Sequence, residues 1–234
     1  MATQPGADTT NAIARFLMSK GLVPTTAWLN NFIATVKPNT LLQAQQQTAL
    51  FRMLSSDLTI STPTPGLGSS LPGDVANVEV ETRDLFGPIT VQVLDIEDIG
   101  RSRWSQVELL ESQDRGEMTK GREVIRIVPG EDGNADTTSA QTSANAASSG
   151  PHKLLLQDAK GTKVHGFELV AVSGIGVPQM LIGAKLVLRN VTVARGVVLL
   201  EPKGVEVLGG KVEVWDRKWK SERKETLKRE AGMQ

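Results

Sequence analysis

Apolar side chains recur at helical spacing in three successive stretches of the first 60 residues. Residues 11–24 place Ile13 and Leu17 on one face, and Gly21 followed by Pro24 ends the helix. Residues 25–38 and 39–58 repeat the pattern, each after residues that favour an N-cap. The candidate caps are Thr25 or Thr26 and Asn39 or Thr40. Short turns between the stretches predict a three-helix bundle over residues 1–60.

The pattern then changes to that of a linker followed by strands. Residues 61–87 begin with a stretch rich in Pro, Gly and Ser, which predicts a linker. A long strand is predicted over 88–99, a hairpin around the turn "DAKG" (158–161), and two or three strands over 184–209. About five strands, with an irregular link between the third and fourth, are typical of an oligonucleotide/oligosaccharide-binding (OB) barrel, predicted over 88–210.

Residues 100–151 form a long insertion between the first two predicted strands. Its first half contains Trp104, Val107 and a Leu109–Leu110 pair, whereas its second half is a Ser/Thr/Ala/Asn tract too polar to form a core. Loops of this length are unusual, so the segment is either a functional insertion or a disordered spacer. The fold class expected is therefore α+β, with the bundle packed on a five-stranded OB barrel.

A basic helix is predicted over residues 211–234, after the break at Gly209–Gly210. Asp216 with Lys220 and Glu225 with Arg229 are spaced as i, i+4 ion pairs. We expect Trp215 and Trp219, one turn apart, to attach this helix to the barrel.

Composition excludes several classes of function. The chain of 234 residues has no cysteine, two histidines and a formal net charge of zero. A disulfide framework and a thiolate metal site are therefore excluded, and global charge does not favour nucleic-acid binding. No apolar run is long enough for a membrane span. We expect no cofactor, no metal and no small-molecule ligand.

Candidate catalytic residues are few and poorly arranged. Glu97 and Asp98 are neighbours on a strand, so they point to opposite faces and cannot act as an acid–base pair. His152 and His165 lie on the two arms of the hairpin and could approach each other, but no carboxylate was identified to orient them. The Gly-x-Gly at 174–176 lacks the context of a phosphate loop. We therefore expect the protein not to be an enzyme.

Several of these stretches together resemble one known family. They are "WLNNFI", "QAQQQTALFRMLSSDL", "GPITVQVLDIEDIGRSRWSQ", "KLLLQDAKGTKVHGFEL" and "GVVLLEPKGVEVLGGKVE". The chain resembles the N-terminal region of the RecQ-mediated genome instability protein 1 family over residues 12–225, and in particular its short members, which lack a second barrel.

The resemblance implies a non-catalytic nuclear subunit that acts beside topoisomerase III, a type IA enzyme, and a RecQ-family helicase. That assembly dissolves double Holliday junctions, and the insertion of family members reaches into the topoisomerase gate and stimulates decatenation. Here the insertion matches the family only in "RSRWSQ". Whether a further small OB-fold subunit takes part is left open.

Candidate topoisomerase contacts lie in two places. The resemblance points to Leu54, Asp57, Leu58 and Lys185, and the foot of the insertion adds Arg103, Trp104, Val107 and Leu110. Leu54 and Leu58 could instead be core residues, while Asp57 and Lys185 are expected to be exposed because they are charged. Trp104 either anchors a partner or caps the mouth of the barrel.

The alternative function is single-stranded DNA binding. The predicted barrel is poor in the aromatic side chains on which bases stack, so the basic C-terminal helix would have to carry this activity. Its candidate residues are Arg217, Lys218, Lys220, Arg223 and Lys224. The same charges would also be found on an ordinary solvent-exposed helix face that binds no DNA.

Overall fold

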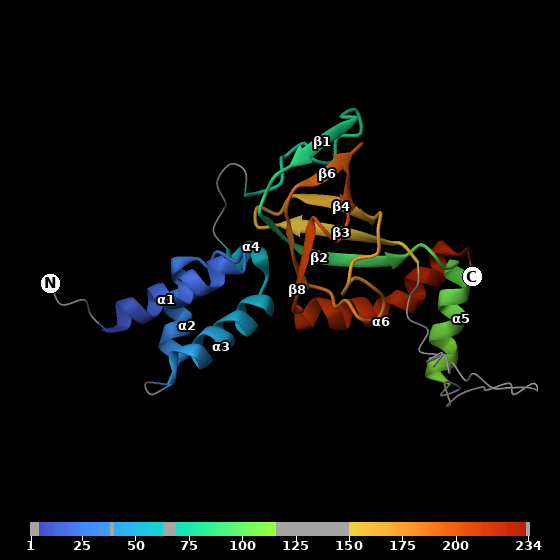
Figure 1. Ribbon diagram of the computed structural model, residues 1–234. Helices are drawn as coiled ribbons and strands as arrows, with labels where there is room; N and C mark the ends of the chain where they lie inside the picture. The colour runs from blue at the N-terminus through green and yellow to red at the C-terminus, as the bar shows by residue number, and fades with distance from the viewer. Residues whose placement is uncertain (1–4, 38–39, 63–68, 116–149, 233–234) are drawn as a thin grey trace, which may run out of the picture.

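A computed structural model describes residues 5–37, 40–62, 69–115 and 150–232 of the chain. In it, an N-terminal helical unit lies at one side of a curled sheet; one further helix runs along the sheet, and another stands at the side away from the helical unit (Figure 1). The helices of the N-terminal unit are α1 (Pro5–Ser19), α2 (Thr26–Thr35), α3 (Leu42–Leu54) and α4 (Leu58–Ser61). The predicted α+β class is thus confirmed, and the short α4 was not predicted as a separate helix.

The core of the helical unit follows the apolar pattern of the sequence. Ile13, Leu17, Phe32 and Met53 are buried in one cluster. Of the alternative caps, Thr25 is the one used in α2, where its hydroxyl accepts a hydrogen bond from the backbone of Trp28. The capping prediction for α3 is wrong: its N-cap is Leu41, without a side-chain hydrogen bond.

The sheet has eight strands in the described residues, not five, in the order β1-β6-β7-β4-β3-β2-β5-β8. Their bounds are β1 (Thr82–Leu85), β2 (Ile89–Asp98), β3 (His152–Asp158), β4 (Lys163–Glu168), β5 (Lys185–Leu188), β6 (Val191–Ala194), β7 (Val197–Leu200) and β8 (Val205–Gly209). Asn190, at φ 50°, separates β5 from β6, so a stretch that reads as one strand is divided. β1 lies within the predicted linker and pairs with β6.

Parallel pairing of β4 with β7, together with antiparallel pairing of β2 with β3 and β5, curls the sheet around its core. The core contains Val91, Leu154, Leu156, Leu186 and Val198, all fully buried. The OB-like curled sheet is thus built from more and shorter strands than predicted. The predicted hairpin turn, strand 197–200 and break at 209–210 are all present.

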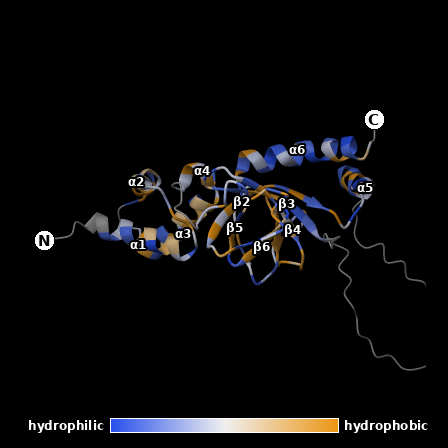
Figure 2. Cartoon of the chain, turned by 90° about the horizontal axis from the view of Figure 1, so that it is seen from above, coloured by the Kyte–Doolittle hydropathy of each residue, from blue (hydrophilic) through white to orange (hydrophobic). Residues whose placement is uncertain are grey.

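The two remaining helices are α5 (Arg103–Asp114) and α6 (Glu213–Glu230). α5 begins just after β2, and α6 follows β8 and runs along the barrel with its C-terminal half beside α5 (Figures 1 and 2). Trp215 and Trp219 of α6 pack against the barrel core, as expected. α5 was not predicted as a helix; it places the first part of the insertion against α6.

Candidate protein-binding site at the base of the insertion

The two ends of the insertion meet at the end of β2. The backbone N–H of Ile99 donates to the carbonyl of Pro151 over 3.1 Å. Gly100 and Gly150 lie so close that a Cβ at Gly100 would be 2.2 Å from the Cα of Gly150. Only glycine allows this approach. Residues 100–151 therefore leave and rejoin the barrel at one point, which we call the neck; residues 116–149 lie outside the described part of the chain.

A buried histidine–carboxylate pair lies next to the neck, because His152 directly follows Pro151 in the chain. The Nδ1 of His152 is 2.5 Å from the Oε2 of Glu168, and both side chains are 3% exposed. Glu168 also accepts hydrogen bonds from the backbone N–H groups of His152 and Val172. The prediction that no carboxylate orients this histidine is wrong, because Glu168 lies 16 residues away and only the hairpin brings it near. The predicted approach of His165 fails, since its side chain is exposed whereas that of His152 is buried.

α5 starts at a Ser102 cap and presents one face to the barrel and another to solvent. Gln106 and Val107 are buried, and Leu110 is partly buried. Trp104 is 60% exposed. An indole this exposed does not cap the mouth of the barrel, so that alternative for Trp104 is wrong. Of the predicted foot residues, Trp104 is open to a partner and Val107 is not. Arg103 is 44% exposed, but its guanidinium already pairs with Glu97 and Glu230.

Most of the basic side chains of α6 already have acidic partners. The pairs within the helix are Arg217 with Glu213, Lys218 with Glu222 and Lys220 with Asp216. Lys224 instead reaches Asp114 of α5, at 2.8 Å. Lys228 pairs with Glu111 over 2.8 Å; this hydrogen bond raises the pKa of Lys228 and lowers that of Glu111. These cations are therefore less available to a phosphate backbone than the sequence suggests.

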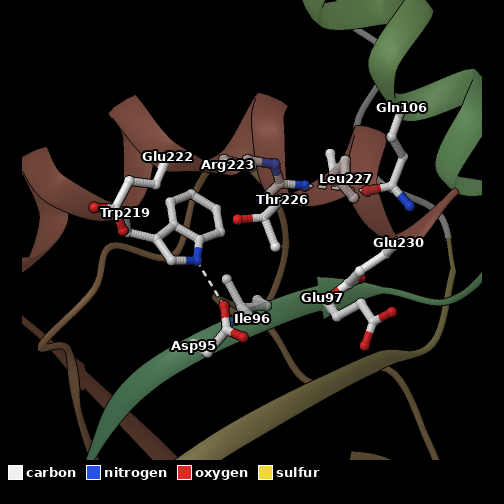
Figure 3. A pocket seen from close by; sticks show the side chains of 10 residues that line it. All are labelled: Asp95, Ile96, Glu97, Gln106, Trp219, Glu222, Arg223, Thr226, Leu227 and Glu230. Atoms are coloured by element: carbon white, nitrogen blue, oxygen red, sulfur yellow. Dashed lines mark hydrogen bonds between the residues drawn. The ribbon is translucent and has the colours of Figure 1, made fainter. Parts of the chain in front are cut away.

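Arg223, the remaining DNA-binding candidate, points inward. A pocket of about 180 Å³ lies between β2, α5 and α6, with Asp95, Glu97, Gln106, Trp219 and Arg223 among its lining residues (Figure 3). The Arg223 guanidinium lies 4.4 Å above the Trp219 ring and donates to the Oε1 of Gln106. Burial lowers the pKa of Arg223. It therefore acts as a packing residue of the barrel face.

The other group of candidates lies at the far side of the barrel, where the helical unit joins it. Leu58 and Lys185 are fully buried, and Leu54 is partly buried. The expectation that Lys185 is exposed is wrong. Its Nζ donates to the carbonyls of Ser56 and Gly183, each at 2.7 Å, and burial lowers its pKa from 10.5 to about 8.

Asp57, expected to be exposed, is partly buried and belongs to the same connection. Its carboxylate caps α4 by accepting from the backbone of Thr59, and it accepts from the Nε2 of Gln92 in β2 over 2.8 Å. The Oε1 of Gln92 accepts from the backbone N–H of Leu58 at 2.9 Å. We call these side chains and Lys185 the bundle–barrel junction. Their charges are used within the chain, and their contribution to partner binding stays a prediction.

Comparison with known proteins decides the family. Residues 17–61 match the model of the RMI1 N-terminal helical domain, and residues 71–223 match that of the RMI1 N-terminal OB-fold domain. The chain belongs to the RMI1 family. A relative, RecQ-mediated genome instability protein 1 of Schizosaccharomyces pombe, is 29% identical over 218 residues, covering 89% of this chain and 90% of that protein.

RMI1-family membership supports a role in genome stability. The OB-fold match runs from before β1 into α6, so both elements belong with the barrel. Among the described residues, no group of three or more His, Asp or Glu side chains could hold a metal ion. Within the same residues, no helix has the length and apolar character needed to cross a membrane.

Proposed function

We propose that this chain is a non-catalytic structural and regulatory subunit of a nuclear complex of topoisomerase III with a RecQ-family helicase. In that complex it helps to dissolve double Holliday junctions and stimulates decatenation through the insertion at residues 100–151. Membership of the RMI1 family, and the name of the relative in Schizosaccharomyces pombe, support the helicase connection.

The observation that best supports this proposal is the presentation of α5. The helix holds Trp104 60% exposed at the point where the insertion leaves the barrel. Exposed tryptophan side chains contribute strongly to protein interfaces. A partner that engages the insertion would therefore meet Trp104 first.

The alternative, DNA binding through α6, has weaker support. Arg217, Lys218, Lys220 and Lys224 are each engaged with a carboxylate, and Arg223 is packed on Trp219. Any DNA affinity would require breaking these pairs and would fall steeply with salt.

The test compares complex formation and decatenation by topoisomerase III with three proteins: the full chain, a variant in which a Gly/Ser linker replaces residues 101–151, and Trp104→Ala. We expect the replacement to abolish stimulation and Trp104→Ala to weaken binding about tenfold or more. Phe86→Ala is a matched control, because Phe86 is an aromatic residue that is 75% exposed and lies outside both groups of candidate contacts. Unchanged binding and stimulation by the replacement variant would refute the proposal, and tight single-strand binding at physiological salt would favour the alternative.

A further inference from the structure

Two basic residues in the C-terminal half of α6, Lys224 and Lys228, reach acidic side chains of α5. Lys224 contacts Asp114 at 2.8 Å, Lys228 contacts Glu111 at 2.8 Å, and the Nε of Arg103 contacts Glu230 at 2.9 Å. Two of the three cations come from α6 and one from α5. We call these three ion pairs the α5–α6 clamp. They connect the start of the insertion to a helix more than 100 residues away in the chain.

Little apolar contact supports this pair of helices. Val107 is the buried apolar residue of α5, and Leu227 is that of α6. Hydrophobic burial on this scale does not fix the direction of a helix, because apolar contact is non-directional. Ion pairs and hydrogen bonds are directional, so they determine how α5 lies.

A second connection links the clamp to the neck. The Nε2 of Gln106 donates to the backbone carbonyls of Asp98 and Arg101, at 2.8 and 3.1 Å. Its Oε1 accepts from Arg223, which is stacked on Trp219 (Figure 3). α6 is therefore attached to the barrel by its tryptophans and to the start of the insertion by Gln106 and the clamp.

We infer that α6 positions the insertion: the α5–α6 clamp fixes the direction in which α5 leaves the neck and so aims Trp104 at a protein partner. The basic residues Lys224 and Lys228 serve this orientation and not nucleic-acid binding. That topoisomerase III is the partner which meets Trp104 rests on the proposed function. The existence of the clamp does not depend on it.

Charge reversal and charge exchange test the clamp in the full chain. The first variant is Lys224→Glu with Lys228→Glu, and the second adds Asp114→Lys and Glu111→Lys, which restores opposite charges across the helices. The matched control is Arg217→Glu with Lys218→Glu, which changes net charge equally on side chains that are 79% and 70% exposed. The readouts are amide hydrogen exchange of α5, with β3 and β4 as internal reference, and affinity for topoisomerase III and for a single-stranded oligonucleotide.

We expect exchange in α5 to rise roughly tenfold in the first variant, to return towards the parent value in the second, and to stay unchanged in the control. Unchanged exchange in the first variant, or no recovery in the second, would overturn the clamp. If amide exchange in α5 changes across the variants as expected but the affinity for topoisomerase III does not change, the clamp is confirmed. The assignment of topoisomerase binding to α5 is then wrong. Equal loss of oligonucleotide affinity in the first variant and the control would show that the basic residues act as a DNA patch, which contradicts the inference.

Discussion

The helical unit joins the barrel at one side, α5 and the C-terminal end of α6 meet at the other, and different forces hold these two regions (Figure 1). At the bundle–barrel junction, Lys185 and Gln92 are fully buried and their hydrogen bonds reach α4 and the residues before it. At the other side, the α5–α6 clamp consists of ion pairs whose side chains are 30 to 66% exposed. Buried polar contacts are costly to break, whereas exposed pairs are weak and screened by salt. The helical unit is therefore held firmly on the barrel, whereas the clamp holds the direction of α5 with a smaller free energy that depends on salt.

The largest effect is expected from breaking the junction with Lys185→Met. This change leaves the carbonyls of Ser56 and Gly183 without their buried donor. We expect the free energy of unfolding to fall by about 1 to 3 kcal/mol, measured by urea denaturation. Lys203→Met serves as control because its side chain is 80% exposed and pairs only with Glu201 in the described structure. Equal effects of the two substitutions would contradict the buried role of Lys185.

The stability of the same variant is also expected to depend on pH. Burial lowers the pKa of Lys185 to about 8 in the folded chain, against an ordinary value of 10.5. Between these values the unfolded chain holds a proton that the folded chain has lost, so stability from this group rises with pH, by at most about 1.4 kcal/mol per unit. The difference in unfolding free energy between parent and Lys185→Met should therefore widen from pH 7 to pH 9.5. If this difference in unfolding free energy instead became smaller from pH 7 to pH 9.5, burial would not lower the pKa of Lys185.

Added salt is expected to have a smaller effect, an increase of amide exchange at the α5–α6 clamp but not at the bundle–barrel junction. Raising NaCl from about 0.05 to about 0.5 M shortens the screening length several-fold. Amide exchange in α5 should rise by roughly two- to fivefold, while α3 and α4 keep their exchange rates because their connections are buried. Mass spectrometry of exchanged peptides measures both in one experiment. If salt raised amide exchange equally in α5 and in α3 and α4, the proposed difference between the clamp and the junction would be wrong.

Local pattern was sufficient for the elements that bury a regular apolar stripe. The first three helices, the hairpin and the strand at 197–200 follow from spacing and turn residues alone. β1 was missed because Leu85 is its only buried residue, so its four-residue sequence reads as linker. α5 was missed because only Gln106 and Val107 of its twelve residues are buried.

The candidate site was less predictable because it depends on partners distant in sequence. Lys185 reads as a surface residue, yet it is separated by 129 residues from the carbonyl of Ser56 that it bonds. Glu168 and His152 meet only through the hairpin. Lys224 and Lys228 of α6 pair with acids on α5 that lie more than 100 residues away in the chain. Trp104 could be predicted from the sequence as a candidate contact, but the sequence did not show that its side chain is exposed.

We propose that the chain binds topoisomerase III at α5. Hydrogen exchange of the full chain, measured with and without topoisomerase III, tests this proposal directly. We expect strong protection of residues 103–114 in the complex, and we expect Trp104→Ala to remove it. Unchanged exchange in α5 upon formation of a stable complex would contradict the claim.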